Sequence, residues 1–306
     1  TWFFLVIGGH ALWSARRELL EMRSIGGYRL LRRLGKGGMG EVWAARHEAL
    51  RRDVAIKVLR PDLLRQEEAV ARFEREVRAT AELSHPNTIR LFDYGVTAEG
   101  QWYYVMELLE GRDLGTLVAE AGPVPPGRAL HLVRQAARAL AEAHARGIVH
   151  RDLKPPNLFA ATLGGERDVV KVLDFGVAKL ADPALTGLTS EGFLAGTPAY
   201  MAPEVIRGGE ATPSADVYAL GGVLYFLLTG RAPFAGPTVD ALLIAHVNEA
   251  PVPPSARVDA PVPADLEAVV LRCLEKRPES RYRDAGELSA ALAACEAAVL
   301  HSPARR

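Results

Sequence analysis

The first hundred or so residues of the chain have the hydrophobic pattern of short strands. Apolar and polar residues alternate over positions 28–34, and positions 54–59 and 102–109 are apolar runs rich in β-branched and aromatic residues. One long helical pattern interrupts them at 66–83, where Phe73 and Val77 share an apolar face. This part of the chain therefore predicts a small sheet with one main helix.

The pattern changes in the second half of the chain. Positions 129–145 are rich in alanine and leucine and predict a helix, and positions 169–173 predict one more strand. Almost everything after Asp216 has helical periodicity, interrupted by prolines near 233 and over 251–263. The chain is therefore predicted to be α+β, with strands early and helices late.

Composition and charge narrow the classes of protein. The chain has 306 residues, enough for one large or two smaller domains, and its 37 basic and 37 acidic residues give no net charge. A nucleic-acid partner is therefore not expected. The two cysteines, Cys273 and Cys295, lie in apolar stretches that predict core positions, and no disulfide framework or zinc spacing is present, which indicates a reducing compartment.

The N-terminal segment, residues 1–27, supports three interpretations. Its apolar run from Trp2 to Trp13 is shorter than the ~20 residues that cross a bilayer, and Arg16, Arg17 and Arg23 follow it. It is the cytoplasmic end of a cut transmembrane helix, or an apolar or amphipathic cap, or sequence upstream of a natural start at Met22.

The densest group of reactive side chains is His-Arg-Asp-Leu-Lys-Pro-Pro-Asn at 150–157. Apolar residues at 148–149 and 158–159 predict two short buried strands with a polar loop between them. Pro155 forbids regular helix and favours an extended Lys154. A rigid loop that carries Asp152 and Asn157 is typical of catalysis, although a capped polar turn would have similar residues.

A glycine-rich stretch lies between two predicted strands at 35–42. Its residues are Gly35, Lys36, Gly37, Gly38, Met39, Gly40, Glu41 and Val42. A dinucleotide site would need a helix directly after the glycines, whereas Val42 and Trp43 continue as a strand, so a hairpin is predicted. Glycines let backbone amides approach phosphate oxygens, although a flexible turn would also be rich in glycine.

Lys57 lies inside an apolar strand and therefore requires a partner, because a buried unpaired ammonium is costly. Glu76, on the border of the apolar face of the predicted helix, is the candidate. The alternative is that Glu76 pairs only with Arg72, one turn earlier on the same helix.

Together with Asp174-Phe175-Gly176 and the stretch 196–204, Gly-Thr-Pro-Ala-Tyr-Met-Ala-Pro-Glu, these motifs resemble those of protein kinases, and most closely the bacterial serine/threonine kinases of eukaryotic type. The resemblance extends from about 28 to about 298. It implies an antiparallel N-lobe (28–109), a mainly helical C-lobe (110–298), a tail (299–306) and ATP bound in a cleft.

The resemblance implies roles for individual residues. Those assigned to ATP are Gly35, Lys36, Gly37, Gly38, Met39, Gly40, Val42, Ala55, Lys57, Met106, Glu107, Leu109, Asp113 and Phe159. Those assigned to phosphoryl transfer are Asp152 as the base, Lys154, Asn157, Lys57, Glu76 and Thr197, with Mg²⁺ (or Mn²⁺) on Asn157 and Asp174. Those assigned to regulation are Arg151, Thr189, Ser190 and Glu191, and those assigned to structure are Glu204, Asp216 and Arg281.

Lys154 and the Gly-Thr-Pro-Ala-Tyr stretch are typical of the serine/threonine branch. The implied partners are protein substrates, a second copy during trans-autophosphorylation, and a membrane if the N-terminal segment is a tether to an otherwise cytoplasmic domain. Glu191 stands where relatives often carry a threonine, which weakens the case for phosphate control there. A pseudokinase would have lost Lys57, Asp152, Asn157 or Asp174, and a small-molecule kinase would lack Ala202-Pro203-Glu204; none of these is missing.

Overall fold

The computed structural model describes residues 24–38, 40–64, 67–97, 99–175 and 198–295, and these residues form two units. The first unit comprises the chain up to Phe73 together with Arg90–Leu108, and the second comprises Glu74–Ile89 and the chain from Leu109 onward. The break at 108/109 lies beside the lobe boundary that the resemblance implies.

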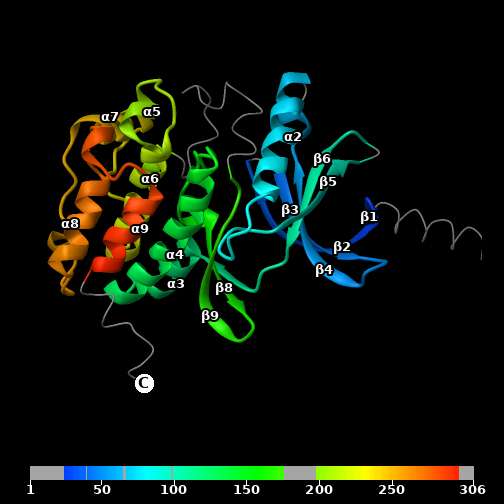
Figure 1. Ribbon diagram of the computed structural model, residues 1–306, viewed down its shortest axis with the longest axis horizontal. Coiled ribbons are helices and arrows are strands. Elements are labelled where there is room, and N and C mark those ends of the chain that lie inside the picture. The colour runs from blue at the N-terminus through cyan, green and yellow to red at the C-terminus, as the bar shows by residue number, and fades with distance from the viewer. Residues whose placement is uncertain (1–23, 39, 65–66, 98, 176–197, 296–306) are drawn as a thin grey trace, which may run out of the picture. The chain divides into compact units, whose positions relative to one another are not determined.

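The first unit is built on a six-stranded antiparallel sheet of order β1-β2-β3-β4-β6-β5 (Figure 1). Its strands are β1 (Ser24–Ile25), β2 (Tyr28–Gly37), β3 (Gly40–His47), β4 (Arg52–Leu59), β5 (Leu91–Val96) and β6 (Trp102–Glu107). A single turn, η1 (Pro61–Leu64), follows β4. The strands of this sheet share one small hydrophobic core, which includes Tyr28, Val54, Ile56, Tyr103 and Val105.

Helix α2 (Glu67–Ala81) crosses the division between the two units, which falls after Phe73. Within the first unit, the buried ring of Phe73 contacts Trp102 and Tyr94 edge-on, with centroid distances of 5.3 and 6.4 Å. The apolar face that the periodicity predicts is therefore the face that α2 buries.

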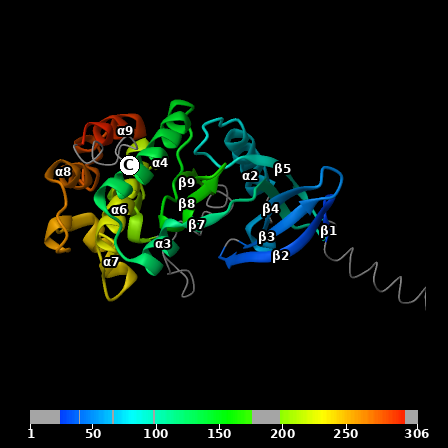
Figure 2. The same cartoon turned by 90° about the horizontal axis from the view of Figure 1, so that it is seen from below.

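The second unit begins with a short sheet, β7-β8-β9, that carries the candidate loop. Its strands are β7 (Gly111–Asp113), β8 (Leu158–Leu163) and β9 (Glu166–Val172), and β9 packs against α4 (Pro126–Ala145) (Figure 2). The residues between 161 and 168, whose role the sequence does not indicate, complete a hairpin that turns at Gly164 and Gly165 and whose register shifts between Ala161 and Leu163. Arg128 of α4 binds Asp168 with two 2.8 Å hydrogen bonds.

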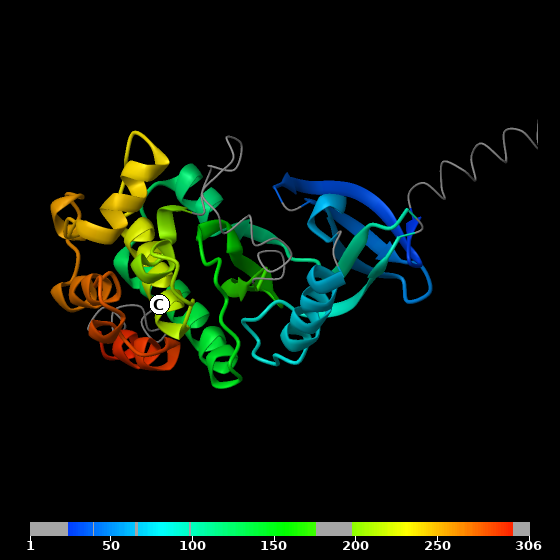
Figure 3. The ribbon, with the colours of Figure 1, turned by 90° about the horizontal axis from the view of Figure 1, so that it is seen from above.

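Helices make up the rest of the second unit. They are α3 (Leu114–Ala121), α5 (Pro203–Ile206), α6 (Pro213–Thr229), α7 (Val239–Asn248), α8 (Ala264–Cys273) and α9 (Ala285–Ala294), with short turns η2 (Pro155–Asn157), η4 (Pro198–Tyr200), η5 (Pro254–Ala256) and η6 (Pro278–Ser280). Helix α6 is apolar on all sides and almost entirely buried, as expected for a central helix. Helix α9 packs along α4 (Figure 3).

The cores of the two units are separate. The larger one contains Cys273 and Cys295, and both thiols are free and buried, which confirms their predicted core positions. Among the described residues, no helix has both the length and the apolar character to cross a membrane.

Candidate active site

The candidate catalytic loop does not begin with the predicted strand. Residues 148–149 are irregular, so that prediction is wrong, whereas Leu158 and Phe159 do open strand β8. The backbone leaves the strand region because Arg151 has a φ of +67°, a left-handed conformation that non-glycine residues rarely adopt.

The buried carboxylate of Asp216, in the first turn of α6, holds this loop. Its Oδ2 accepts from the His150 amide at 2.7 Å and its Oδ1 accepts from the Arg151 amide at 2.9 Å. These two amides are therefore bound to a side chain and unavailable for strand pairing. The Ile148 amide, before them, donates to the Ala143 carbonyl of α4 at 2.9 Å, so the hydrophobic flank continues from the helix and does not pair as a strand.

Asp152, Lys154 and Asn157 lie together at the end of the loop. Lys154 Nζ donates to Asp152 Oδ2 at 2.8 Å, and Asn157 Nδ2 donates to the Asp152 carbonyl at 2.7 Å and to Oδ2 at 3.2 Å. Asp152 is 6% exposed, and the turn η2 that opens with Pro155 fixes the spacing of the three residues. A carboxylate held by a cation and an amide can accept a proton from a hydroxyl group.

Backbone contacts bring Asp174 to the same place. The Leu173 amide donates to the Asn157 carbonyl at 2.9 Å, and the Leu173 carbonyl lies 2.8 Å from Nε2 of the buried His150. Because His150 Nδ1 accepts from the Asp152 amide at 3.3 Å, the ring carries its proton on Nε2 and donates it to Leu173. Asp174 itself has a φ of +52°.

The donor set suits Mg²⁺. Both bonds of the Asn157 amide use its nitrogen, so Oδ1 is the atom that could serve as a metal ligand. The residues that the structure describes contain no group of three or more His, Cys, Asp or Glu suited to a metal. One carboxylate and one amide fit a cation that takes its remaining ligands from water and phosphate, as Mg²⁺ does.

The first unit carries the residues that the resemblance assigns to the base and phosphates of ATP. Lys57 is 7% exposed on β4, directly opposite Val42 of β3, and Ala55 is directly opposite Met106 of β6. Glu107 ends β6, and the Lys57 ammonium lies 5.8 Å from the centre of the Tyr104 ring.

The glycine-rich stretch forms the predicted hairpin, in which Gly37 pairs with Gly40. Gly40 has a φ of +147°, and a Cβ there would lie 2.0 Å from the Val58 carbonyl oxygen. A side chain is therefore excluded at this glycine. Gly35 and Lys36 lie on β2, with Gly38 between the strands.

Three further ATP candidates, Leu109, Asp113 and Phe159, lie in the second unit. Asp113 pairs with Phe159 across β7 and β8. The Asp113 carboxylate also accepts from the Thr116 amide at 2.9 Å and from its hydroxyl at 2.6 Å, so it caps α3. This capping role of Asp113 was not predicted from the sequence.

Glu76 contacts a residue that the sequence did not suggest. Its Oε1 lies 3.5 Å from Nη1 of Arg151, and both side chains are mostly buried. The sequence suggested Lys57 or Arg72 as the partner of Glu76, and it did not indicate a residue of the catalytic loop. Sequence periodicity placed Glu76 at the border of a face but gave no signal for this pairing.

Glu204 and Arg281 form a buried pair far from one another in sequence. Arg281 donates to both Glu204 oxygens at 2.8 Å, and it also donates to the carbonyls of Ser214, Glu275 and Lys276. This guanidinium ties α5 to the start of α6 and to the segment before η6.

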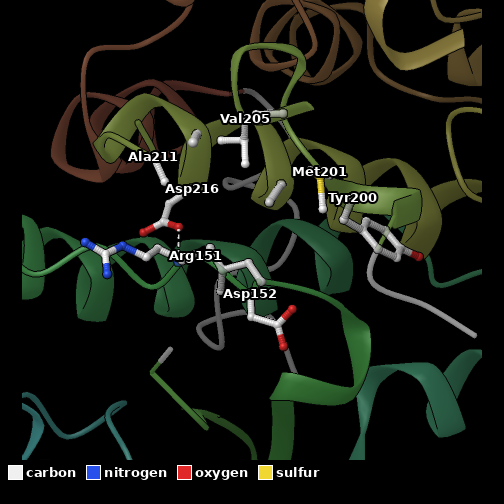
Figure 4. A pocket seen from close by; sticks show the side chains of 11 residues that line it. Arg151, Asp152, Tyr200, Met201, Val205, Ala211 and Asp216 are labelled. Carbon is white, nitrogen blue, oxygen red and sulfur yellow. Dashed lines mark hydrogen bonds between the residues drawn. The ribbon is translucent and has the colours of Figure 1, made fainter. Parts of the chain in front are cut away.

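A pocket beside the loop is lined mostly by apolar side chains (Figure 4). Its walls are Leu153, Tyr200, Met201, Ala202, Val205, Ala211, Ala215 and Ala219, with Arg151, Asp152 and Asp216 at its edge. Five candidates, Met39, Thr189, Ser190, Glu191 and Thr197, lie outside the described residues.

Comparison with known proteins covers nearly all of this chain. The family model described as "Protein kinase domain" matches residues 28–292. Two Myxococcus xanthus proteins, serine/threonine-protein kinases pkn3 and Pkn1, are 41% and 45% identical over 272 and 269 residues, in each case 88% of this chain. Serine/threonine-protein kinase PknB of Mycobacterium leprae is 43% identical over 263 residues, or 85% of this chain.

These alignments cover 50%, 38% and 41% of the three relatives, so the chain spans half of their length or less. Among solved structures, the kinase domain of Mycobacterium tuberculosis PknI is similar, with a TM-score of 0.68 and 29% identity. That match covers 88% of this chain and 96% of the PknI chain.

Proposed function

Because this chain belongs to the protein kinase family, within its bacterial serine/threonine branch, we propose that it transfers the γ-phosphoryl group of ATP to serine and threonine hydroxyls of proteins. The observation that carries this proposal is that Lys154 and Asn157 each donate a hydrogen bond to the carboxylate of Asp152. Phosphoryl transfer needs positioned charges more than covalent chemistry, and this group provides them.

Asp152 would accept the proton of the attacking hydroxyl, and Lys154, which already contacts Asp152, would offset charge on the transferred group. Asn157 and Asp174 would hold Mg²⁺, with Mn²⁺ as the alternative, and the bound cation would neutralise phosphate charge. In the first unit, Lys57 and the amides of the glycine hairpin would bind the phosphates.

Regulation through Arg151 belongs to the same proposal. Arg151 pairs with Glu76, and a phosphate on Thr189 would bring nearly two negative charges to the same guanidinium. Ser190 and Glu191 are the neighbouring candidates for the anion that engages Arg151. A second copy of the chain would transfer the phosphoryl group from ATP in trans.

The N-terminal apolar segment and the arginines after it support a membrane tether, with the catalytic domain on the cytoplasmic side, where ATP is available. A pseudokinase scaffold is the weaker candidate, because Lys57, Asp152, Asn157 and Asp174 are all present.

The test is incubation of the purified chain with labelled ATP, Mg²⁺ and a general protein acceptor, followed by phosphosite mapping by mass spectrometry. We expect label on serine and threonine, and a loss of at least about 10²-fold in Asp152→Asn with ATP binding retained. Label transferred only to small molecules, or undiminished transfer by Asp152→Asn, would contradict the proposal.

A further inference from the structure

Arg60 lies directly after strand β4 and has no part in the site described so far. Its Nη1 donates to the carbonyl oxygen of Gly38 at 3.3 Å. Gly38 is in the turn of the glycine hairpin, between β2 and β3, and stands 22 positions earlier in the chain. The guanidinium therefore joins the end of β4 to the tip of the hairpin that, in the proposed function, binds the phosphates of ATP.

The tip of the glycine hairpin has little packing of its own. Residues 31–38 are exposed, and a Cβ built on Gly35 or Gly37 would meet nothing within 4 Å. The pairing of β2 with β3 also shifts register between Arg33 and Gly35. Because glycine loses more conformational freedom on ordering than any other residue, a tip of this composition needs contacts from outside to hold one position.

Glu41 joins the two strands of the hairpin to each other. Its Oε1 lies 3.3 Å from Arg33 Nη1 and 3.5 Å from Lys36 Nζ, and Lys36 is its direct partner across the β2–β3 pair. These ion pairs lie within the hairpin. They do not fix its position relative to the rest of the sheet, which depends on contacts with β4.

Two contacts with the end of β4 reach the tip. Gly40 pairs with Leu59, and a Cβ on Gly40 would lie 2.0 Å from the Val58 carbonyl oxygen, so the β3 side of the tip rests on the β4 backbone. Arg60 follows Leu59, and the proline after it favours an extended backbone at Arg60. Its side chain therefore starts beside the hairpin, and its bond to Gly38 holds the turn itself.

This bond links two groups that have to meet the same phosphates. Lys57 lies on β4, shortly before Arg60, and in the proposed function its ammonium and the hairpin amides bind the triphosphate together. A tip that moved away from β4 would take its amides away from phosphates that Lys57 still held. Fixing the two parts relative to one another before the nucleotide arrives lowers the entropic cost of binding it.

We propose that Arg60 is a positioning residue for nucleotide binding, which holds the tip of the glycine hairpin against the end of β4 through the Gly38 carbonyl. The proposal rests on the proposed kinase function. Since Arg60 acts through Gly38, its removal should shorten the residence of the nucleotide and leave the binding of the protein substrate unchanged.

Three variants test the bond. Arg60→Met keeps most of the side-chain stem and removes the donor, and Arg60→Lys restores a donor at a similar reach. Arg46→Met is the matched control. Arg46 is an exposed arginine at the other end of β3, and its Nη2 donates to the Arg51 carbonyl across the β3–β4 turn, also at 3.3 Å. The control therefore removes a bond of the same kind and length from a turn that has no role in the proposed function.

The first measurement is the release of a fluorescent ADP analogue by stopped flow, together with KM values. We expect Arg60→Met to release the analogue at least about threefold faster than the parent and to raise the KM for ATP by a similar factor, with the KM for an added peptide within about twofold. Arg60→Lys should lie between Arg60→Met and the parent, and Arg46→Met should match the parent. Equal release rates in Arg60→Met and Arg46→Met would overturn the proposal.

Hydrogen exchange of the nucleotide-free chain separates this role from attraction between the Arg60 charge and the phosphates. The amides of Gly37 and Glu41 should exchange at least about threefold faster in Arg60→Met than in Arg46→Met. Unchanged exchange would overturn the proposal even if release became faster, because the effect would then come from charge. If the parent bound no ATP, the proposed function would fail instead, and the exchange rates would still decide whether Arg60 holds the hairpin.

Discussion

Glu76 of α2 and Arg151 of the catalytic loop form an ion pair with 3.5 Å between Oε1 and Nη1. The pair joins a helix and a loop that are 75 positions apart in the sequence. The Arg151 side chain is 33% exposed, and the anion beside its guanidinium in this structure is the Glu76 carboxylate. Any phosphate that is to engage Arg151 must therefore compete with Glu76 or share Arg151 with it.

The first prediction concerns this competition. After phosphatase treatment, the parent should show a lag on an added peptide that ATP preincubation removes, whereas Thr189→Ala should stay slow because no phosphate reaches Arg151. The activity of Arg151→Gln on the peptide should be equally low before and after preincubation with ATP. Glu191→Ala is the matched control and should keep the lag. If Thr189→Ala keeps full activity and the parent's lag while Glu191→Ala is inactive, the anion for Arg151 is the Glu191 carboxylate and not a phosphate.

The second prediction concerns the cation at Asn157 and Asp174. Asp174→Asn removes the only charge of this ligand pair, so tight ATP binding should need at least about tenfold more Mg²⁺. The measurement is a Mg²⁺ titration of ATP affinity by calorimetry. Asp168→Asn alters an acidic residue of strand β9 that binds Arg128, and it should leave the Mg²⁺ dependence unchanged. Equal Mg²⁺ dependence in Asp174→Asn and the parent would remove Asp174 from the metal site.

The third prediction concerns stability. Arg281→Met should lower the free energy of unfolding by about 3–5 kcal/mol, because it leaves the Glu204 carboxylate and several carbonyls without their donor. Arg283→Met removes a guanidinium whose side chain is 79% exposed, and should cost less than about 1 kcal/mol. Urea unfolding of both variants checks this. Similar losses in the free energy of unfolding would show that the buried pair contributes no more than an exposed arginine.

The fourth prediction concerns acid stability. Burial, followed by the positive charge of Lys276, lowers the pKa of His246 to about 4 from the ordinary 6.5. Between these values the unfolded state binds more protons, so stability that is present above pH 6.5 is lost as the pH falls towards 4.

His246 should account for about 2 kcal/mol of the stability lost between pH 7 and pH 5. His246→Gln keeps a partner for the Tyr218 hydroxyl, which lies 2.8 Å from His246 Nδ1. Between pH 7 and pH 5 the free energy of unfolding of this variant should fall by about 2 kcal/mol less than that of the parent. The check is urea unfolding of both proteins at the two pH values. Parallel pH profiles would show that His246 does not titrate as proposed.

The kinase fold that the resemblance implies is confirmed. The order of early strands and late helices could be predicted from the residues themselves, because periodicity along the chain reports local structure directly. The glycine hairpin between β2 and β3 is an example, since its turn and both strands lie within one short stretch. The loop at 150–157 was found for the same reason, because its residues are consecutive.

What the sequence did not predict depends on residues that fold together from distant positions. Ile148 and Val149 have the sequence of a strand, but the Ile148 amide bonds back to Ala143 of α4, and Asp216 binds the two amides that follow Val149. His144 and Ala285 are 141 positions apart, and no local pattern connects an imidazole to the amide of a later helix. The sequence suggested Lys57 or Arg72 as the partner of Glu76, and no local pattern indicated its contact with Arg151 of the catalytic loop.

The left-handed backbone at Arg151 sets folding and activity against each other at one position. A glycine there would relieve an unfavourable conformation worth roughly 1–2 kcal/mol, yet it would remove the guanidinium that faces Glu76. Selection for thermostability alone would therefore tend to erase this arginine, as it often does at strained functional positions. Stabilising substitutions in this chain should be sought in its helical core, with the loop before Asp152 left unchanged.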